Sequence, residues 1–390
     1  MALLDSFWIA GFESSCHRLS DGRRLDLVAS TRHDRFAAAD YRRLREAGIA
    51  TARDGTGWPC ASRDRTLDAF LQRIRAARDA GVQVIWDLCH YGWPDGIDIW
   101  KPAFVRALAD YARAVARLVA AETDEPAIYT PINEISFWSW AGGEVGCLNP
   151  FARGRGFELK AQLARAAIAA CEAVLAVDSR SRFLHAEPII HIAADPARPH
   201  QRDAAERHRL AQYESFDMIA GRLWPQLGGE ERLVDLVGVN YYPKNQWILD
   251  GPTIHRGEPL HRPFRDLLAE VHARYGRPLV LAETGAEGDE RAPWLAHVGA
   301  EVRAAMRAGV PVEGICLYPI LDYPGWDDDR HCPTGLWGYA DAEGRRELDR
   351  PLARELARQR ALFAREGLAG GIDHPRSHGA AHVAEEAAFG

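Results

Sequence analysis

The sequence predicts a closed (β/α)8 barrel in a single domain, and three observations lead to this fold. Eight short apolar runs alternate with eight longer stretches of helical period along most of the 390 residues. Several helical stretches end at a glycine, as in Ala47-Gly48 and Ala80-Gly81, and the next apolar run begins at once. This spacing is typical of the connection between units of a repeated β-α fold. No Gly-x-Gly-x-x-Gly follows the first run, which argues against a dinucleotide-binding sheet.

The apolar runs are predicted to be barrel strands, because side chains of both parities are apolar, as strands buried on both faces require. In chain order the strands are expected at Phe7–Phe12, Ile49–Arg53, Val82–Leu88, Ala127–Ile132, Arg182–Ala186, Leu233–Asn240, Pro278–Ala282 and Val312–Leu317. The helices are expected at Phe36–Ala47, Leu67–Ala80, Pro102–Ala121, Glu158–Val177, Arg202–Ala220, Leu260–Tyr275, Ala292–Ala308 and Leu348–Arg365. The remaining length falls in loops that follow strands, where the active face of a barrel gathers its functional residues, namely Gly92–Trp100, Ser136–Arg155, Ile189–Arg202 and Tyr241–Gly257.

Composition and the chain ends narrow the expected setting. The barrel is expected to span residues 1–368, and residues 369–390, rich in Gly, Ala and His, are expected to form a loose tail. The 55 acidic residues outnumber the 48 basic ones, so we expect no nucleic-acid partner and a neutral or cationic ligand. An export signal and a long apolar span are both missing, which favours a cytoplasmic protein without a membrane partner. The seven scattered cysteines are interpreted as reduced thiols.

Polar side chains end or follow the predicted strands, at the place where barrel enzymes carry catalytic residues. In chain order they are Arg53, Asp54, Asp87, His90, Asn133, Glu134, His185, Glu187, Asn240, Tyr241, Tyr242, Glu283 and Tyr318. Strands four and seven face each other across the barrel mouth, so Glu134 and Glu283 are expected to meet there. Acetal cleavage needs one carboxylic acid and one carboxylate, whose pKa values their surroundings must separate. One such Glu could equally be a rim residue paired with an Arg, but two of them beside Arg, His, Asn and Tyr favour glycoside hydrolysis.

At these positions the sequence resembles the family 1 glycoside hydrolases, which are β-glucosidase-like members of a larger clan of retaining (β/α)8 glycosidases. The motifs that carry the resemblance, in order over roughly residues 7–365, are Ala10–His17, His90–Pro94, Thr130–Glu134, Gly238–Tyr242, Leu281–Gly285 and Tyr318–Trp326. The resemblance implies that Glu134 is the general acid/base and Glu283 the nucleophile. It also implies that Asn133 donates to the sugar 2-hydroxyl and that His90 binds near the 3-hydroxyl. Arg53 and either Tyr241 or Tyr242 would hold the nucleophile.

Three departures from the family pattern leave the sugar open. His17 lies where the family places a sugar-binding Gln, and Tyr318 replaces the usual Trp platform. Gly325, just before Trp326, replaces a Glu that grips the 4- and 6-hydroxyls. A site built to hydrogen-bond a hydroxyl rejects analogues that lack it, so the loss of this Glu could redirect selection among β-sugars.

Other candidate residues are assigned more simply. Trp138 and Trp326 are predicted to stack on sugar rings, and Glu187 either contacts substrate or supports a residue that does. The run Asp327–Asp329 with His331 is interpreted as a solvated loop. Because no zinc-binding motif or paired cysteine ligands occur, we expect no metal and no cofactor.

The sequence therefore predicts a retaining β-glycosidase that hydrolyses small β-glycosides through a covalent glycosyl-enzyme. A retaining enzyme requires carboxyls of Glu134 and Glu283 ~5 Å apart. A transglycosidase using the same site is an alternative, since water and an acceptor sugar compete for one intermediate. A second alternative is an inactive carbohydrate-binding barrel, against which the intact Glu134, Glu283, Asn133 and Arg53 argue, and a metal-dependent hydrolase lacks ligands. The expected partner is a small carbohydrate or glycoside, and a homo-oligomer stays open.

Overall fold

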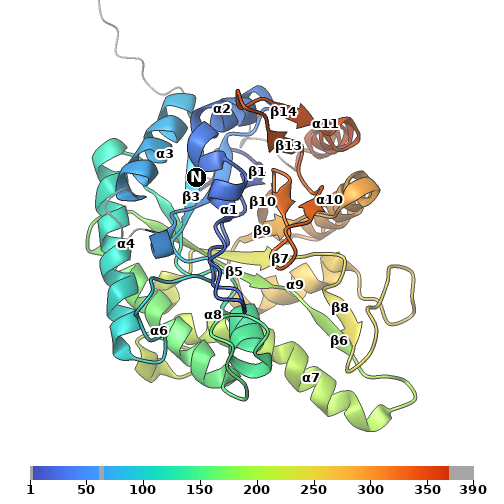
Figure 1. Ribbon diagram of the computed structural model, residues 1–390. Helices are drawn as coiled ribbons and strands as arrows, with labels where there is room; N and C mark the ends of the chain where they lie inside the picture. The colour runs from blue at the N-terminus through green and yellow to red at the C-terminus, as the bar shows by residue number, and fades with distance from the viewer. Residues whose placement is uncertain (1–2, 61–65, 369–390) are drawn as a thin grey trace, which may run out of the picture.

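Eight parallel strands close into a barrel with helices around it in the computed structural model, which describes residues 3–60 and 66–368 (Figure 1). The barrel strands are β1 (Trp8–Gly11), β2 (Thr51–Gly55), β3 (Gln83–Asp87), β4 (Ile128–Thr130), β5 (Arg182–Pro188), β7 (Leu236–Asn240), β9 (Leu279–Thr284) and β10 (Val312–Leu317). Neighbours pair in chain order, and the parallel pairing of β1 with β10 closes the ring. The predicted fold class is confirmed, and each predicted strand overlaps an observed one.

The helices pack on the outside of the barrel, where their apolar faces cover the strands (Figure 1). They are α1 (Leu27–Ser30), α2 (His33–Glu46), α3 (Thr66–Ala80), α4 (Pro102–Glu122), α6 (Gly156–Leu175), α7 (Arg202–Leu210), α8 (Glu214–Ile219), α9 (Phe264–Tyr275), α10 (Arg291–Arg307) and α11 (Arg350–Arg365). The helix predicted over 202–220 is divided into α7 and α8 by the 3-10 turn η4 (Ala211–Tyr213). The buried Gln212 of this turn accepts from the Ile190 backbone and donates to the Arg209 carbonyl, so it bonds to a neighbouring loop instead of extending the helix.

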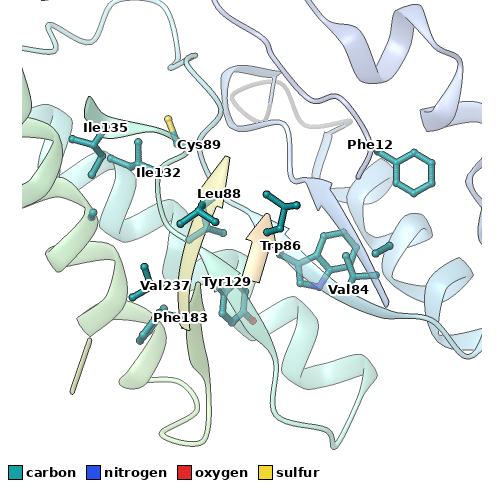
Figure 2. Close-up of a cluster of buried hydrophobic side chains, with 14 of the residues drawn as sticks. Phe12, Val84, Trp86, Leu88, Cys89, Tyr129, Ile132, Ile135, Phe183 and Val237 are labelled. Atoms are coloured by element: carbon teal, nitrogen blue, oxygen red, sulfur yellow. The ribbon is translucent and has the colours of Figure 1, made fainter. Parts of the chain in front are cut away.

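Side-chain alternation along the strands divides the core into two layers. On β3, Val84 and Trp86 face the helices in the larger cluster (Figure 2), whereas Ile85 belongs to a smaller cluster drawn from the other barrel strands. Because successive side chains point to opposite faces, Asp87 shares the inward parity of Ile85. Arg53 on β2 likewise has the opposite parity to Ala52, which packs in the outer layer. The last inward residues of β2 and β3 are therefore charged and lie at the carboxyl end of the barrel.

The long loops at this end contain more structure than the sequence predicted. The segment after β4 folds into α5 (Ile135–Trp138) and the π-helix η2 (Ser139–Val145). The loops after β5 and β7 contribute β6 (His191–Ala193) and β8 (Gln246–Ile248), which pair in parallel outside the barrel (Figure 1). Two small sheets follow β10, formed by β11 (Tyr323–Pro324) with β12 (His331–Cys332) and by β13 (Trp337–Ala340) with β14 (Arg346–Leu348). Short 3-10 turns complete the described chain: η1 (Trp58–Cys60), η3 (Pro199–Gln201), η5 (Pro225–Leu227), η6 (Glu231–Leu233) and η7 (Gly288–Glu290).

The remaining predictions concern the tail, membrane-spanning helices and the cysteines. The tail predicted at residues 369–390 lies outside them. Among the helices that are described, none combines the length and apolarity needed to cross a membrane. Six cysteines of the described residues lie outside any disulfide, and of these Cys147 is exposed and the other five are buried.

Candidate active site

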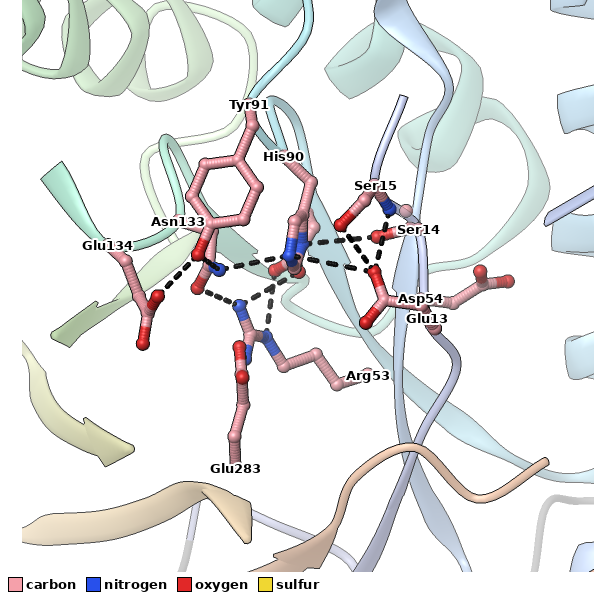
Figure 3. Close-up of polar contacts among 12 residues, drawn as sticks. Glu13, Ser14, Ser15, Arg53, Asp54, His90, Tyr91, Asn133, Glu134 and Glu283 are labelled. Carbon is pink, nitrogen blue, oxygen red and sulfur yellow. Dashed lines mark hydrogen bonds and ion pairs between the residues drawn. The ribbon is translucent and has the colours of Figure 1, made fainter. Parts of the chain in front are cut away.

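Arg53 is the centre of a hydrogen-bond network at the barrel mouth (Figure 3). Its side chain is 1% exposed, and its guanidinium donates to Asp87 Oδ1 at 2.9 Å, Glu283 Oε1 at 2.7 Å and Asn133 Oδ1 at 2.6 Å. The Tyr318 ring lies 5.5 Å from the guanidinium carbon. Burial alone would lower the pKa of Arg53, but the carboxylates of Asp87 and Glu283 raise it well above its usual value. A permanent cation is thus fixed beneath the mouth.

Asn133 connects this cation to His90 and Tyr91. Because its Oδ1 accepts from Arg53, its Nδ2 faces His90 Nε2 at 3.0 Å and the Tyr91 hydroxyl at 3.1 Å. His90 then donates from Nδ1 to Asp87 Oδ2 at 3.3 Å. The contacts leave Asn133 a single orientation, with its amide nitrogen toward His90 and Tyr91.

Glu134 follows β4 in a strained backbone conformation. Its φ of 47° and ψ of 59° place it in the left-handed region of backbone conformation, directly before α5. Tyr91, in the loop after β3, also has a positive φ, of 62°. Such conformations cost of order 1–3 kcal/mol each and persist where surrounding contacts hold them. The carboxylate, 8% exposed at the residue level, accepts from Asn240 Nδ2 at 2.8 Å on Oε1 and from the Tyr91 hydroxyl on Oε2. Both oxygens of Glu134 are therefore held at the mouth.

Glu283 near the end of β9 is held from the opposite side. Its Oε1 accepts from Arg53 and its Oε2 from the Tyr242 hydroxyl at 2.9 Å. Tyr241 and Tyr242 were the two tyrosines predicted to hold the nucleophile, and the prediction of Tyr241 is wrong. The Tyr241 ring stacks on Phe264, with centroids 4.1 Å apart, in the layer behind the barrel. Successive side chains at a strand end point to opposite faces, so Tyr242 enters the mouth and Tyr241 does not.

The electrostatic surroundings of the two glutamates differ. Burial is the largest influence on both and raises the pKa of each. At Glu283 the guanidinium of Arg53 opposes this rise, while the charge of Glu134 reinforces it. At Glu134 the neutral donors Tyr91 and Asn240 are the strongest opposing influences, and the charge of His90 opposes the rise less. Two carboxylates in one desolvated site share a proton more readily than they both ionise. Arg53 favours the ionised form of Glu283, so when the pair holds one proton its surroundings favour that proton on Glu134.

Glu187 at the end of β5 lies behind Glu134. Its Oε2 accepts from the Ser136 backbone N–H at 2.9 Å, in the first turn of α5. Burial raises the pKa of Glu187 to about 7, and its charge contributes to the raised pKa of Glu134. Of the two roles predicted for Glu187, the structure therefore gives it the supporting one.

One wall of the site is aromatic. The His17 ring lies 5.0 Å from Trp326 and 6.2 Å from Tyr91, and Tyr318 lies parallel to His90 at 6.2 Å. Burial lowers the pKa of His17 to about 4, so this imidazole is neutral at pH 7. Within residues 3–60 and 66–368, no protein group hydrogen-bonds His17 Nδ1, Trp326 Nε1 or the Tyr318 hydroxyl. Buried polar atoms are normally satisfied, so these three atoms are suited to a polar ligand.

Trp138 does not belong to this wall, and its prediction as a sugar platform is wrong. Its side chain is fully buried, its Nε1 donates to the Asn149 carbonyl at 2.7 Å, and its ring packs against Tyr91 and Trp93. The sequence did not reveal that α5 turns this ring toward the core. Trp138 therefore supports Tyr91 from behind.

Four functional candidates had no predicted role. Asp87 and Asn240 were strand-end residues without an assignment, and their inward parity is the signal that could have found them. Tyr91 and Glu13 lie in loops, where no periodicity predicts side-chain direction. In the acidic run after Trp326, Asp329 pairs with Arg23 at 2.9 Å on the surface, and among the described residues no group of three or more His, Cys, Asp or Glu is placed to hold a metal ion.

Comparisons with known proteins identify the fold. No model of a known protein family matches the chain, and no curated protein matches its sequence. Among solved structures, the family 1 β-glucosidase of Thermotoga maritima superposes with a TM-score of 0.75 at 14% identity, over 91% of this chain and 98% of that one. The same enzyme is known in complex with deoxynojirimycin. The AHE enzyme of Alicyclobacillus herbarius also gives a TM-score of 0.75, at 17% identity over 92% and 98% of the two chains. At these identities the likeness establishes a shared barrel fold.

Proposed function

We propose that this protein is a retaining, β-glucosidase-like glycosidase that hydrolyses small β-glycosides, with Glu283 as nucleophile and Glu134 as general acid/base. The observation that carries the proposal is the unequal treatment of two buried carboxyls at one barrel mouth. Glu283 receives a guanidinium, and Glu134 receives only neutral donors in its direct hydrogen bonds. This is the division between carboxylate and carboxylic acid that acetal cleavage requires. The likeness in fold to the T. maritima β-glucosidase supports it.

In the first step the proton of Glu134 passes to the glycosidic oxygen while an oxygen of Glu283 attacks the anomeric carbon. The bond between that carbon and the aglycone oxygen breaks, the aglycone leaves as an alcohol, and an ester to Glu283 forms. Arg53 and Tyr242 hold the attacking carboxylate by one oxygen each. Asn133, which lies between Arg53 and Tyr91, presents its amide nitrogen where a hydroxyl next to the anomeric carbon would lie.

In the second step Glu134 acts as a base. Esterification removes the charge of Glu283, so one of the influences that keep a proton on Glu134 disappears and its carboxylate is stable. It accepts a proton from water as the water oxygen attacks the anomeric carbon, and the sugar leaves with its original configuration. Glu134 is then protonated and Glu283 ionised, as they were before the reaction.

Rescue by azide tests both assignments. Turnover of 4-nitrophenyl β-glycosides is expected to fall by about 10⁴-fold or more in Glu283→Ala, and azide should then yield an α-glycosyl azide with inverted configuration. In Glu134→Ala, the ester to Glu283 still forms from this activated substrate, so azide should yield the β-glycosyl azide. Glu347→Ala, which removes an exposed carboxylate from β14, is the matched control. Wild-type activity in either site variant would refute the assignments, and an inert wild-type protein across gluco-, galacto- and other aryl β-glycosides would refute the function.

A further inference from the structure

Glu13 is a further buried carboxylate at the barrel mouth, and the proposed mechanism does not use it. It lies two residues beyond the end of β1 and is 7% exposed. Its Oε1 accepts from the backbone N–H of Ser15 at 2.9 Å and from the Ser15 hydroxyl at 2.5 Å. Within the described part of the chain, both hydrogen bonds to this carboxylate fall on Oε1. The Ser15 contacts fix the side chain and leave Oε2 for another donor.

The carboxylate faces the part of the site that is remote from the proposed bond cleavage. Figure 3 shows it turned toward His90, whose Nε2 lies 3.9 Å from Glu13 Oε1. His90 is in turn bonded to Asn133, and Asn133 to Tyr91 beside Glu134. Glu13 is therefore separated from the catalytic pair by an imidazole and an amide. In a pyranose ring whose anomeric carbon lies at that pair, the carbons on the far side are C3 and C4.

Polar groups around Glu13 lack hydrogen-bond partners among the described residues, as is typical of a ligand-binding wall. The Glu13 carboxylate raises the pKa of Tyr318 further than burial does alone, so its charge is felt at this ring, and the Tyr318 hydroxyl has no partner among the described residues. Beyond it, the buried His17 Nδ1 is also unpartnered within the described chain. An acceptor carboxylate beside two unpaired, neutral polar groups suits the hydroxyls of a sugar.

The charges at the mouth exclude an anionic sugar. Asp87 and Glu283 both contact Arg53 and compensate its single charge in excess. Glu13 adds a further negative charge whose partners are Ser15 and the His90 imidazole. A phosphate or carboxylate on the ligand would be desolvated next to Glu13, and His90, the cationic group within reach, already contacts both Asp87 and Glu13.

We propose that Glu13 is the residue that selects the sugar, accepting hydrogen bonds from the adjacent hydroxyls on C3 and C4 of a neutral glycone and excluding phosphorylated or uronic glycones. The inference rests on the proposed glycosidase function and names its substrate class. It also accounts for Gly325, because a carboxylate delivered from the end of β1 can grip hydroxyls where the position before Trp326 offers no side chain.

Substrate truncation tests the role of Glu13. The parent is the aryl β-glycoside that the wild type hydrolyses fastest, compared with its 3-deoxy, 4-deoxy and 6-phosphate analogues and the corresponding uronide. A hydrogen bond to a charged group corresponds to about 10- to 100-fold in kcat/KM, so the wild type should lose this much for each deoxy analogue. Glu13→Gln should have a kcat/KM on the parent that is lower than the wild-type value by about the same factor. Its kcat/KM on the deoxy analogues should then be little lower than its own value on the parent. Its relative activity on the anionic analogues should rise. Glu347→Gln serves as the exposed control.

The outcomes separate the two proposals. If Glu13→Gln lowers kcat/KM by the same factor on the parent and on the deoxy substrates, Glu13 has a structural role and the inference is overturned. The glycosidase function would then still stand. A wild type that prefers the phosphorylated or uronic substrate would overturn it as well. If no glycoside is hydrolysed, calorimetric binding of deoxynojirimycin and its 4-deoxy analogue to the wild type and Glu13→Gln makes the same comparison without turnover. If Glu13→Gln does not fold, Glu13→Asp serves instead, because it keeps the negative charge on a shorter side chain that lies farther from the sugar. The same loss of discrimination between the parent and the deoxy substrates is expected.

Discussion

Two adjacent residues of β2, Arg53 and Asp54, enter two buried ionic networks that differ in one respect. Asp54 points outward, where Arg73 donates to both its oxygens at 2.9 Å, Tyr41 donates at 2.7 Å and His33 lies at 3.2 Å. Burial would raise the pKa of Asp54, but Arg73 and His33 outweigh it and hold the pKa far below its usual range. Arg53 points inward, where it lowers the pKa of Asp87 but leaves the pKa values of Glu283 and the nearby Glu134 raised, and where several polar atoms have no partner among the described residues.

The difference separates a structural network from a functional one. In the outward network donors and carboxylates complete each other, so a ligand has nothing to supply. In the inward network the negative charges exceed the cation and several donors are unused. Burial and ion pairing are common to both networks. The excess negative charge and the unused donors of the inward network are what identify it as the site. The following changes are expected to affect one network and spare the other.

The largest effect is expected from Glu283→Gln. Loss of the nucleophile should lower kcat for an aryl β-glycoside by about 10⁴-fold or more. The free energy of unfolding should be unchanged or increased, because a buried charge with a raised pKa is removed. Steady-state kinetics and urea unfolding of the same preparation measure both quantities. A variant that loses stability in proportion to activity would contradict the separation of the networks.

Asp54→Asn should have the opposite profile. It leaves Arg73 without its carboxylate and His33 with Asp40 alone, and breaking a buried ion pair in this way costs about 3–5 kcal/mol of stability. The kcat of the folded protein should stay at the wild-type value, since Asp54 faces away from the mouth. Urea unfolding followed by tryptophan fluorescence, with kcat measured well below the unfolding midpoint, tests this. A large fall in kcat at full folding would show that the two networks are coupled.

Two adjacent tyrosines offer a smaller, matched comparison. Tyr242→Phe removes a hydrogen bond to the Glu283 carboxylate, which corresponds to about 10- to 100-fold in kcat/KM. Tyr241→Phe removes a hydroxyl that accepts from Gln246 behind the barrel, and kcat/KM should not change. Equal effects of the two substitutions on kcat/KM would contradict the assigned directions of these side chains.

The pH dependence of stability gives the finest distinction. Burial raises the pKa of Glu283 from its ordinary 4.5 to about 7 in the folded protein. Between these values the unfolded chain has released a proton that the folded one retains, so stability is full below the lower value and falls as pH rises through the upper one. Asp54 has a lowered pKa, so its contribution is present above the ordinary Asp value and is lost only in strong acid. Urea unfolding between pH 4.5 and 8 should show the decline in the wild type and a smaller decline in Glu283→Gln. The acidic limb of the kcat/KM profile should likewise lie near pH 7. An acidic limb of the kcat/KM profile at the ordinary Glu pKa of 4.5 would refute this environment for Glu283.

The parts of this protein that depend on side-chain parity and burial could be predicted from its sequence. The run Val312–Leu317 coincides with β10, and Glu134 and Glu283 were found because both follow strands that end at the same mouth. The choice between Tyr241 and Tyr242 was also a matter of parity and could have been made. The inward turn of Trp138 depends on α5, which begins after the left-handed Glu134 and whose first turn bonds to Glu187.

Loop conformation set the remaining limit. Tyr91 and Glu13 reach the site through loops after β3 and β1, where turns decide side-chain direction and the pattern of apolar residues carries no information about it. Their neighbour His90 was found at a strand end and received its role from the family resemblance, which also singled out His17. Residues that depart from the family pattern had to be located in three dimensions.

The pairing of β6 with β8 has an evolutionary consequence. The loops after β5 and β7 hydrogen-bond to each other outside the barrel, and Asn245 ties them again through the Ile189 carbonyl at 2.9 Å. An insertion in one loop must be matched by the other or it breaks their common sheet. The two segments therefore form a single unit of variation beside the mouth. Diversification of this rim is expected to proceed by paired changes, while the carboxyls on the strands beneath remain in place.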